Sequence, residues 1–283
     1  MVIGPTRPIL RYHGGKWRLA PKLIEMFPSH HIYVEPFAGG CGVLLRKPRA
    51  YSEVINDLDK DVVNLFRVLR NPLQAEELER MMRLTPYARV EFTEAATRDG
   101  VDDVERARRY MVRCWMAYSG RIENTQGWRA GVTRSYTTPA TDWAGLPCQV
   151  AATTLRLQGV VIEHKPAIQV IGQYDSPNTL FYCDPPYVRS TRSSLRYEGE
   201  SAYTHEMNDA DHTNLAKALH AAEGMVALSG YACALYDELY GEWERFDMDT
   251  MASGQQGGIV RTESLWLNPA AIRSRRNLFT ETA

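Results

Sequence analysis

The sequence FYCDPPY, residues 181–187, places a short apolar run directly before an aspartate and two prolines. The apolar residues predict a buried strand, and this strand must stop at Pro185 because proline has no backbone N–H to donate to a sheet. Proline also biases the residue before it away from helical geometry. The motif therefore predicts a rigid turn at the carboxyl end of a strand, where open α/β sheets place their ligand sites.

This turn combines groups that suit a flat base carrying an exocyclic amine. The Asp184 carboxylate and nearby backbone carbonyls can accept hydrogen bonds from the amine, and the Tyr187 ring can stack on the base. A proline-rich turn without a chemical role is the alternative that the motif alone leaves open. Features elsewhere in the chain favour the functional interpretation.

The composition is that of an ordinary globular protein: 283 residues, of which 44% are hydrophobic and 24% charged. No apolar run is long enough to span a membrane, and the N-terminus lacks an apolar signal core. We therefore expect a cytoplasmic protein without membrane contact. The five cysteines are scattered, and the seven histidines show no ligand spacing. These patterns predict reduced thiols and no metal site.

The net charge of −1 argues against a uniformly basic surface but allows a local basic patch. Residues 104–134 contain seven arginines against two glutamates. A helix with a solvated face explains part of this excess, because apolar side chains in the same stretch have the spacing of a buried stripe. The later part has no helical period. There the sequence predicts a loop that contacts phosphates or bases through Arg121, Arg129 and Arg134.

The N-terminal part of the chain reads as the opening of a doubly wound α/β sheet. Residues 31–37 predict a strand, residues 38–42 a glycine-rich turn, and residues 43–45 the start of a helix. Residues 51–55 predict a second strand, and residues 61–70 a helix with one apolar face. This order of elements is typical of doubly wound folds.

Pro72 interrupts the alternation, which resumes with a predicted strand at residues 159–163. Residues 72–157 therefore form a mostly helical insertion into a domain made of residues 1–71 and 158–283. In its second half we expect further strands at 179–183 and 225–229, with helices starting near 166, 211 and 232. The last two strands, 243–248 and 262–267, have a helix-free connection and should form an antiparallel hairpin.

Residues 35–42 (EPFAGGCG) form a glycine-rich strand-to-helix turn that matches neither GxGxxG nor a P-loop. Glycines there let a ligand approach the backbone closely. Asp57 ends the next strand, where an acid can bind both hydroxyls of a ribose. The pattern favours an adenosine-type ligand without a pyrophosphate, although a tight turn without a ligand is a common alternative. Residues 11–17, with Lys16 after two glycines, could hold a carboxylate or form a solvated turn.

Four motifs together resemble the alpha group of Dam-like DNA adenine-N6 methyltransferases. They are YHGGK at 12–16, EPFAGG at 35–40, ND at 56–57 and DPPY at 184–187. They come in that group's order of lysine motif, cofactor turn, insertion and catalytic motif. RTESLWL at 261–267 also resembles the closing strand of the family. The resemblance covers nearly the whole chain.

The resemblance implies a doubly wound, Rossmann-like methyltransferase sheet with a C-terminal antiparallel hairpin and an inserted target-recognition domain. It implies transfer of a methyl group from S-adenosylmethionine to adenine N6 in a short sequence of double-stranded DNA, by base flipping and direct in-line transfer. The residues implied to contact the cofactor or shape its pocket are Tyr12, Lys16, Phe37, Gly39, Asp57 and Asp184. Those implied to receive the flipped adenine are Asp184, Pro185, Pro186 and Tyr187.

Two features depart from the family pattern. Where the family often has an aspartate and an aromatic residue after the strand before the catalytic one, this chain has Glu163-His164-Lys165. The recognition segment is only loosely similar, at residues 118–121 and 127–129. The chain has no recognisable nuclease segment, so any restriction endonuclease partner would be a separate protein.

Other functions stay open at this point. The same chemistry could act on cytosine N4, on RNA adenine or on a protein glutamine amide, although Asp184 before Pro-Pro-Tyr favours adenine. A DNA-binding protein with a vestigial cofactor pocket is a second alternative, which the presence of Lys16, Asp57 and Asp184 opposes. A dinucleotide oxidoreductase is the third, and the absence of GxGxxG speaks against it.

Overall fold

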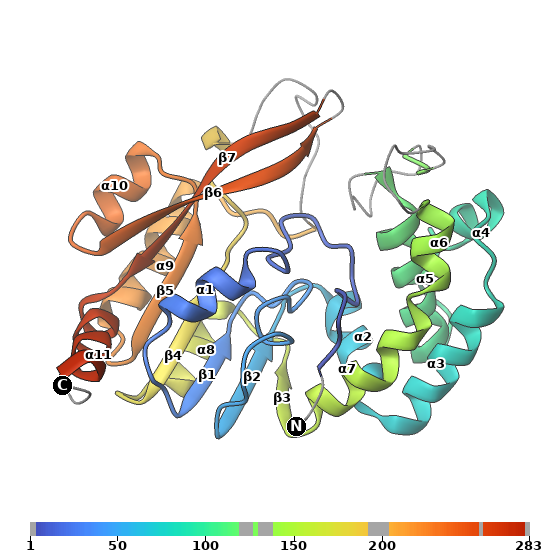
Figure 1. Ribbon diagram of the computed structural model, residues 1–283, viewed down its shortest axis with the longest axis horizontal. Coiled ribbons are helices and arrows are strands. Elements are labelled where there is room, and N and C mark those ends of the chain that lie inside the picture. Colours follow the sequence, from blue (N-terminus) through green and yellow to red (C-terminus); the bar gives the residue numbers. More distant parts are fainter. Residues whose placement is uncertain (1–3, 119–126, 130–137, 192–203, 255–256, 281–283) are drawn as a thin grey trace.

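Seven strands form one mixed sheet in the order β3-β2-β1-β4-β5-β7-β6 (Figure 1). The computed structural model describes residues 4–118, 127–129, 138–191, 204–254 and 257–280. Five strands run parallel: β1 (Ile32–Glu35), β2 (Ser52–Asn56), β3 (Val160–Glu163), β4 (Thr179–Cys183) and β5 (Met225–Gly230). The order reverses between β1 and β4, which confirms the predicted doubly wound sheet and marks the place where such sheets bind ligands.

The last two strands, β6 (Glu244–Gly254) and β7 (Gly257–Leu267), form the predicted antiparallel hairpin, and β7 also pairs antiparallel with β5. The hairpin is longer than predicted because its pairing continues to Gly254 and Gly257. The apolar pattern indicated only the half that packs on the sheet, where Leu265 and Leu267 are fully buried. The outer half projects beyond the other strands (Figure 1).

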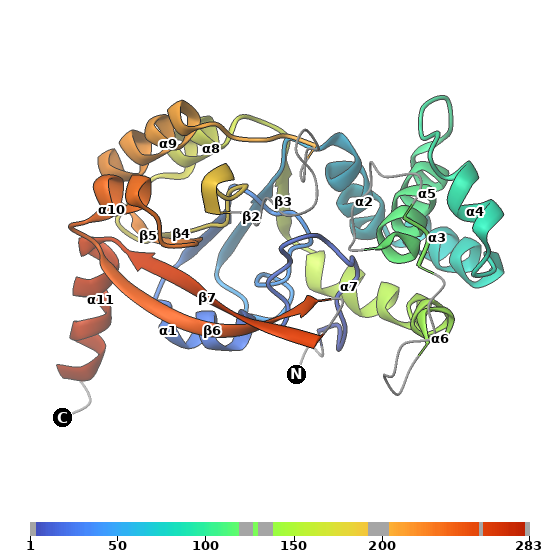
Figure 2. The ribbon, with the colours of Figure 1, turned by 90° about the horizontal axis from the view of Figure 1, so that it is seen from above.

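Helices cover both faces of the sheet (Figure 2). On one face lie α8 (Ala167–Tyr174), α9 (Asp209–Ala221) and α10 (Ala234–Tyr240), and on the other lie α1 (Ala20–Met26) and α11 (Pro269–Thr280). Alternate strand residues feed two cores, as the pleat of a strand requires. Val34 and Phe181 belong to the core under α8–α10, whereas Tyr33 and Leu180 belong to the opposite one.

The sequence analysis gave no prediction for α11. The signal that could have found this helix is Asn268-Pro269: the Asn268 side chain accepts a hydrogen bond from Ala271 N–H at 2.9 Å, and proline suits the first turn of a helix. Among the described residues, the helices fall short of the length and apolar character needed to cross a bilayer.

The helix predicted to open at residues 43–45 is wrong, because the chain forms only a series of turns there. Leu45 N–H donates to Cys41 O at 3.1 Å, as in a helical turn. The N–H of Leu44, however, donates to the Glu35 carboxylate at 2.7 Å. Pro48 follows at once and disfavours helical geometry in the residue before it.

Residues 72–157 contribute helices that gather beside α2 (Lys60–Arg70), at the β3 edge of the sheet (Figure 1). They are α3 (Pro72–Leu84), α4 (Arg89–Glu94), α5 (Asp103–Met116), α6 (Pro139–Ala144) and α7 (Val150–Leu157). Helix α2 packs against α3, α5 and α7. The inserted helices thereby continue the core that lies on one face of the sheet.

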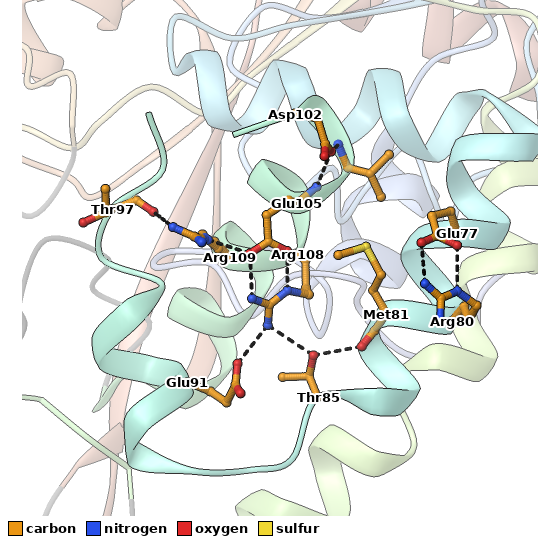
Figure 3. A network of polar contacts seen from close by, with 11 residues as sticks. Glu77, Arg80, Met81, Thr85, Glu91, Thr97, Asp102, Glu105, Arg108 and Arg109 are labelled. Atoms are coloured by element: carbon orange, nitrogen blue, oxygen red, sulfur yellow. Dashed lines mark hydrogen bonds and ion pairs between the residues drawn. The ribbon is translucent and has the colours of Figure 1, made fainter. Parts of the chain in front are cut away.

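Arg106 of α5 pairs with Asp61 of α2 at 2.6 Å, whereas the other arginines of α5 are engaged within the insertion, Arg108 and Arg109 as Figure 3 shows. Arg108 pairs with Glu105 at 2.6 Å and with Glu91 at 3.0 Å, and Arg109 also pairs with Glu105 at 2.6 Å. Arg113 is only 1% exposed, and its guanidinium donates to a backbone carbonyl. The sequence predicted a solvated helix face for these arginines. In the structure they are instead paired with carboxylates or buried against the backbone.

A buried cluster of charges joins α7 to β2. The Glu53 carboxylate is 3% exposed and accepts from the Arg156 guanidinium at 2.6 and 2.9 Å. Lys47 Nζ lies 3.2 Å from the same carboxylate and is buried as well. The cluster ties the end of the insertion to a central strand.

We expect Glu53→Ala to lower the free energy of unfolding by about 3–5 kcal/mol, because it leaves two buried cations without their carboxylate. Urea unfolding followed by circular dichroism measures this effect. The matched control is Glu77→Ala, which removes the exposed ion pair with Arg80 on α3 and should hardly move the midpoint. Equal midpoints for the two variants would contradict a structural role for the Glu53 cluster.

Candidate active site

A cavity of about 520 Å³ lies at the carboxyl ends of β1, β2 and β4. The structure brings together in its wall most of the residues that the sequence singled out, namely Tyr12, Lys16, Phe37, Gly39, Asp57, Asp184 and Pro186. Pro185 and Tyr187 are buried and are not among the lining residues. The size of the cavity is typical of small-molecule sites.

The Lys16 ammonium group lies against the Asp184 carboxylate. Lys16 Nζ is 2.9 Å from each oxygen of Asp184 and donates its hydrogen bond to Oδ2. Asp184 Oδ1 is buried and makes no hydrogen bond with any residue that the structure describes. The Lys16 ammonium therefore fixes the carboxylate at the end of β4, and only one of its two oxygens makes a hydrogen bond within the described residues.

Burial and neighbouring charges shift the protonation of this pair. Burial raises the pKa of Asp184, and the Lys16 cation opposes that shift. Burial alone would lower the pKa of Lys16, but the carboxylates of Asp184 and Glu263 outweigh it and raise this pKa well above its usual value. Lys16 therefore stays charged over the physiological range.

The glycine-rich turn accommodates the N-terminal motif of the chain. Gly39 has φ of +46°, and a Cβ atom on it would lie 2.8 Å from Cε1 of Tyr12. A Cβ atom on Gly42 would lie 2.8 Å from the backbone nitrogen of Trp17. These glycines make room for Tyr12 and Trp17, and both glycines also line the cavity, so their role in letting a ligand approach stays a prediction.

The Asp57 carboxylate is oriented by two backbone N–H groups. Gly39 N donates to Oδ2 and Asp59 N donates to Oδ1, both at 2.8 Å. Burial nevertheless raises the pKa of Asp57 to about 6. Asp57 thus lines the cavity at the end of β2 with a preset geometry, in the position where the sequence placed a ribose-binding acid.

Tyr187 and Glu263 lie beside the lysine–aspartate pair. The Tyr187 hydroxyl donates to Glu263, and the Tyr187 ring meets Tyr231 edge-on at 4.7 Å between centroids. Lys16 Nζ lies 4.9 Å from the centroid of the Tyr187 ring. Glu263 comes from β7 and was not predicted as a site residue. Its sequence neighbours Thr262 and Ser264 are polar as well, so no apolar pattern singles Glu263 out in the sequence.

The segment that departs from the family pattern lies outside the cavity wall. Glu163 binds the Tyr174 hydroxyl at 2.8 Å and the Lys165 ammonium at 3.1 Å. The wall is formed instead by the next residues, and the Ile168 side chain there is a lining residue that the sequence analysis missed. Asn56 joins this region to β1, because its amide donates to both Pro36 O and Lys165 O at 2.9 Å.

The predicted DNA-contacting arginines are described only in part. Arg129 has a side chain that is 17% exposed and lies 3.6 Å from the Asp142 carboxylate. Arg121 and Arg134 lie outside the described residues. Within the part of the chain that the structure covers, no three His, Cys, Asp or Glu side chains gather in a way that could hold a metal ion.

The sheet order and the cavity at its switch point are those of a Rossmann-like fold, consistent with a methyltransferase. Residues 12–252 match the family model described as D12 class N6 adenine-specific DNA methyltransferase. The chain belongs to this family, which confirms the resemblance seen in the sequence and makes the protein a DNA adenine methyltransferase by class.

Characterised proteins similar to the chain include three named as methyltransferases or methylases. The chain is 26% identical to the type II methyltransferase M1.LlaDCHI of Lactococcus lactis subsp. cremoris over 83% of this chain and 84% of that protein. It is 23% identical to the DNA N-6-adenine-methyltransferase of Escherichia phage P1 over 68% of this chain but 26% of that protein. It is 32% identical to the DNA adenine methylase of Haemophilus influenzae over 23% of this chain and 22% of that protein.

A solved structure of precorrin-8w decarboxylase from Methanobacterium thermoautotrophicum also aligns with the chain. The alignment has a TM-score of 0.33 and 9% identity, and it covers 94% of this chain and 92% of that one. A likeness this weak carries no argument about function.

We expect Gly39→Ala to weaken ligand binding in the cavity by about tenfold or more, because the new Cβ atom would displace the Tyr12 ring from the cavity wall. Isothermal titration with S-adenosylmethionine, the ligand that the sequence resemblance implies, measures the affinity. Gly159→Ala is the matched control: Gly159 also has positive φ, at +81°, but nothing lies within 4 Å of its added Cβ atom. Both variants suffer the backbone strain, so equal affinities would show that the Tyr12 contact is unimportant for the cavity.

Glu35 generates a prediction about pH. It is 2% exposed, lines the cavity, and accepts on Oε1 from the Tyr33 hydroxyl at 2.8 Å and from Leu44 N–H. Burial raises its pKa from 4.5 to about 7. The folded state therefore binds the Glu35 proton more tightly than the unfolded state, so this group's contribution to stability falls as pH rises from 4.5 to 7.

Glu35→Gln keeps the accepting oxygen and removes the titration. Relative to wild type, the variant should gain on the order of 2–3 kcal/mol of unfolding free energy between pH 4.5 and pH 8. Urea unfolding at several pH values tests this, with the exposed Glu244→Gln on β6 as control. A difference between wild type and Glu35→Gln that stays constant with pH would rule out a raised pKa.

Proposed function

We propose that this protein transfers the methyl group of S-adenosylmethionine to the N6 amino group of an adenine within a short sequence of double-stranded DNA. The observation that carries the proposal is the meeting of Lys16, Asp57 and Asp184 in one cavity, at the proline-terminated end of β4. Family membership supports methylation of DNA adenine. The cofactor, the base flipping and the roles of the residues are the parts that we add.

The cavity residues suit S-adenosylmethionine. The carboxylates of Glu35, Asp57, Asp59 and Asp184 outnumber the Lys16 cation in the wall, which favours a positively charged ligand. Asp57 would bind the ribose hydroxyls, and Tyr12, Phe37 and Gly39 would shape the adenosine pocket. When bound, S-adenosylmethionine supplies an electrophilic methyl group on a sulfonium centre.

The DPPY turn would hold the acceptor. An adenine inside a duplex is reached only by extrusion, at a cost of a few kcal/mol. Pro186 and Tyr187 would contact the extruded base, and stacking on an aromatic ring recovers about 1–3 kcal/mol. The Asp184 carboxylate, whose Oδ1 makes no hydrogen bond with a described residue, would accept a hydrogen bond from one N6–H, and the Pro185 carbonyl would accept one from the other N–H.

Asp184 would act mainly by orientation. Two acceptors aligned on the amine favour a pyramidal nitrogen and direct its lone pair at the methyl carbon. The amine then attacks in line, the bond between carbon and sulfur breaks, and no covalent enzyme intermediate forms. The N6 proton becomes acidic only as the new bond forms, so a weak base such as Asp184 suffices. Lys16 keeps this carboxylate in place.

The two parts of the chain would divide the work. Residues 1–71 and 158–283 would form the catalytic domain, and residues 72–157 would read the DNA target. Arg121, Arg129 and Arg134 would contact the DNA backbone or bases. The relative from Lactococcus lactis is named a type II methyltransferase, which supports a role beside a separate restriction endonuclease.

We expect Asp184→Ala to lower methyl transfer to DNA by about 100-fold or more while the protein stays folded, because the amine loses its main acceptor. Transfer of a labelled methyl group to DNA, RNA and protein, with mass spectrometry of the product base, measures both rate and acceptor. Full activity of the variant would refute the role of Asp184. Wild-type transfer to cytosine, RNA or protein instead of DNA adenine would refute the proposed function.

We expect Arg129→Ala to weaken DNA binding and to reduce the slope of log K against log salt by about one, since each phosphate contact releases about one counterion. The same holds for Arg121→Ala and Arg134→Ala. Fluorescence anisotropy over a salt series measures the slope. Arg273→Ala, exposed on α11, is the control and should leave the slope unchanged. Slopes equal to wild type in all three variants would remove this loop from the interface.

A further inference from the structure

Glu263 is a buried carboxylate whose position in the fold is unusual. It lies on β7, opposite Met248 of β6, and is 7% exposed. The residues matched by the family model end at 252, so that match assigns Glu263 no role. Its carboxylate touches two members of the site, because Lys16 Nζ lies 3.2 Å from Oε1 and the Tyr187 hydroxyl donates to the same oxygen.

Lys16 has three N–H donors, and three acceptors surround it. They are Gly14 O at 2.8 Å, Asp184 Oδ2 at 2.9 Å and Glu263 Oε1 at 3.2 Å. Together they fix every donor direction of the ammonium group. The position of Asp184 depends on Lys16, and the position of Lys16 depends on Glu263. Glu263 also contacts the DPPY turn directly, because the hydroxyl of Tyr187, the last residue of the turn, donates to it.

Making these contacts with a carboxylate at position 263 costs electrostatic free energy. Asp184 and Glu263 place two negative charges against one buried ammonium group. Burial raises the pKa of Glu263, Lys16 opposes the shift, and the Asp184 charge adds to it. A glutamine could accept both hydrogen bonds without the excess charge, and buried ion clusters are often replaced without loss of stability. The accepting oxygen of Glu263, rather than its charge, is therefore the feature that holds Lys16 and Tyr187.

We infer that Glu263 is a positioning residue of the methyl-transfer site, which holds Lys16 and Tyr187 so that Asp184 and the DPPY turn meet the acceptor amine in one orientation. This inference rests on the proposed function. Glu263 does not line the cavity and acts through its two neighbours; without it, Lys16 still has Gly14 O and Asp184 as partners at the donor pocket. Its loss should therefore lower the rate of transfer more than the affinity for the donor.

The test compares Glu263→Ala and Glu263→Gln with Glu244→Ala, an exposed glutamate of the same hairpin. Single-turnover methylation of DNA gives the rate, titration with S-adenosylmethionine gives the donor affinity, and thermal unfolding reports the fold. For Glu263→Ala we expect a rate loss of about 10- to 100-fold with donor affinity within about threefold of wild type. Glu263→Gln keeps the accepting oxygen and should recover at least half of that loss on a logarithmic scale. Glu244→Ala should match wild type.

The outcomes separate the two levels of the proposal. A wild-type protein that methylates DNA adenine, together with a Glu263→Ala variant at the wild-type rate, would overturn the positioning role alone. Equal losses of rate and donor affinity, or a Glu263→Gln variant as slow as Glu263→Ala, would overturn it as well. If Glu263→Ala does not fold, the Glu263→Gln comparison decides: a folded glutamine variant with no detectable transfer would contradict positioning through hydrogen bonds. A wild-type protein without transfer to DNA would overturn the proposed function itself.

Discussion

The ion pair between Lys16 and Asp184 is the interaction on which the site depends. It joins a segment before the first strand to the turn that ends β4, 168 positions further along the chain. Either charge buried alone would cost several kcal/mol, so each group requires the other where it is. Because Gly14 O and Glu263 take the remaining donors of Lys16, the pair has one orientation. Oδ1 of Asp184 makes no hydrogen bond with a described residue.

The sheet order explains why these distant segments meet. β1 lies between β2 and β4, and all three run parallel, so their carboxyl ends open on the same edge. Glu35, Asp57 and Asp184 follow from these ends. The N-terminal motif reaches the same edge by packing over the glycine turn, where the Tyr12 ring occupies the space that Gly39 leaves. The cavity is thus closed by residues 12–16 on one side and by strand ends on the other.

Local signals in the sequence were enough to predict the strands and acids at this edge of the sheet. β4 was predicted with its observed bounds because it is buried on both faces and reads as an unbroken apolar run ended by proline. Asp57 and Asp184 followed from their places at strand ends. The failed helix at residues 43–45 and the unpredicted Glu263 share a cause: each depends on a side-chain contact that the local sequence pattern does not show. The N–H of Leu44 turns to Glu35, and Glu263 has meaning only beside Lys16. Glycines 39 and 42 indicated that space was needed, but not that Tyr12 and Trp17 fill it.

The acidic wall of the cavity works against the stability of the fold. Burial raises the pKa of Glu35 to about 7 and that of Asp57 to about 6, which means that the protein spends free energy to ionise them near neutral pH. Amides in their places would relieve this cost and still accept hydrogen bonds. Charged groups that lower the stability of a fold are typical of sites whose chemistry requires them. Under the proposed function the missing counter-charge arrives with the donor, because a sulfonium cation beside these carboxylates favours their ionised form. Binding of the donor and ionisation of the wall would then stabilise each other, and both gains would lapse once the methyl group has left and the sulfur is neutral.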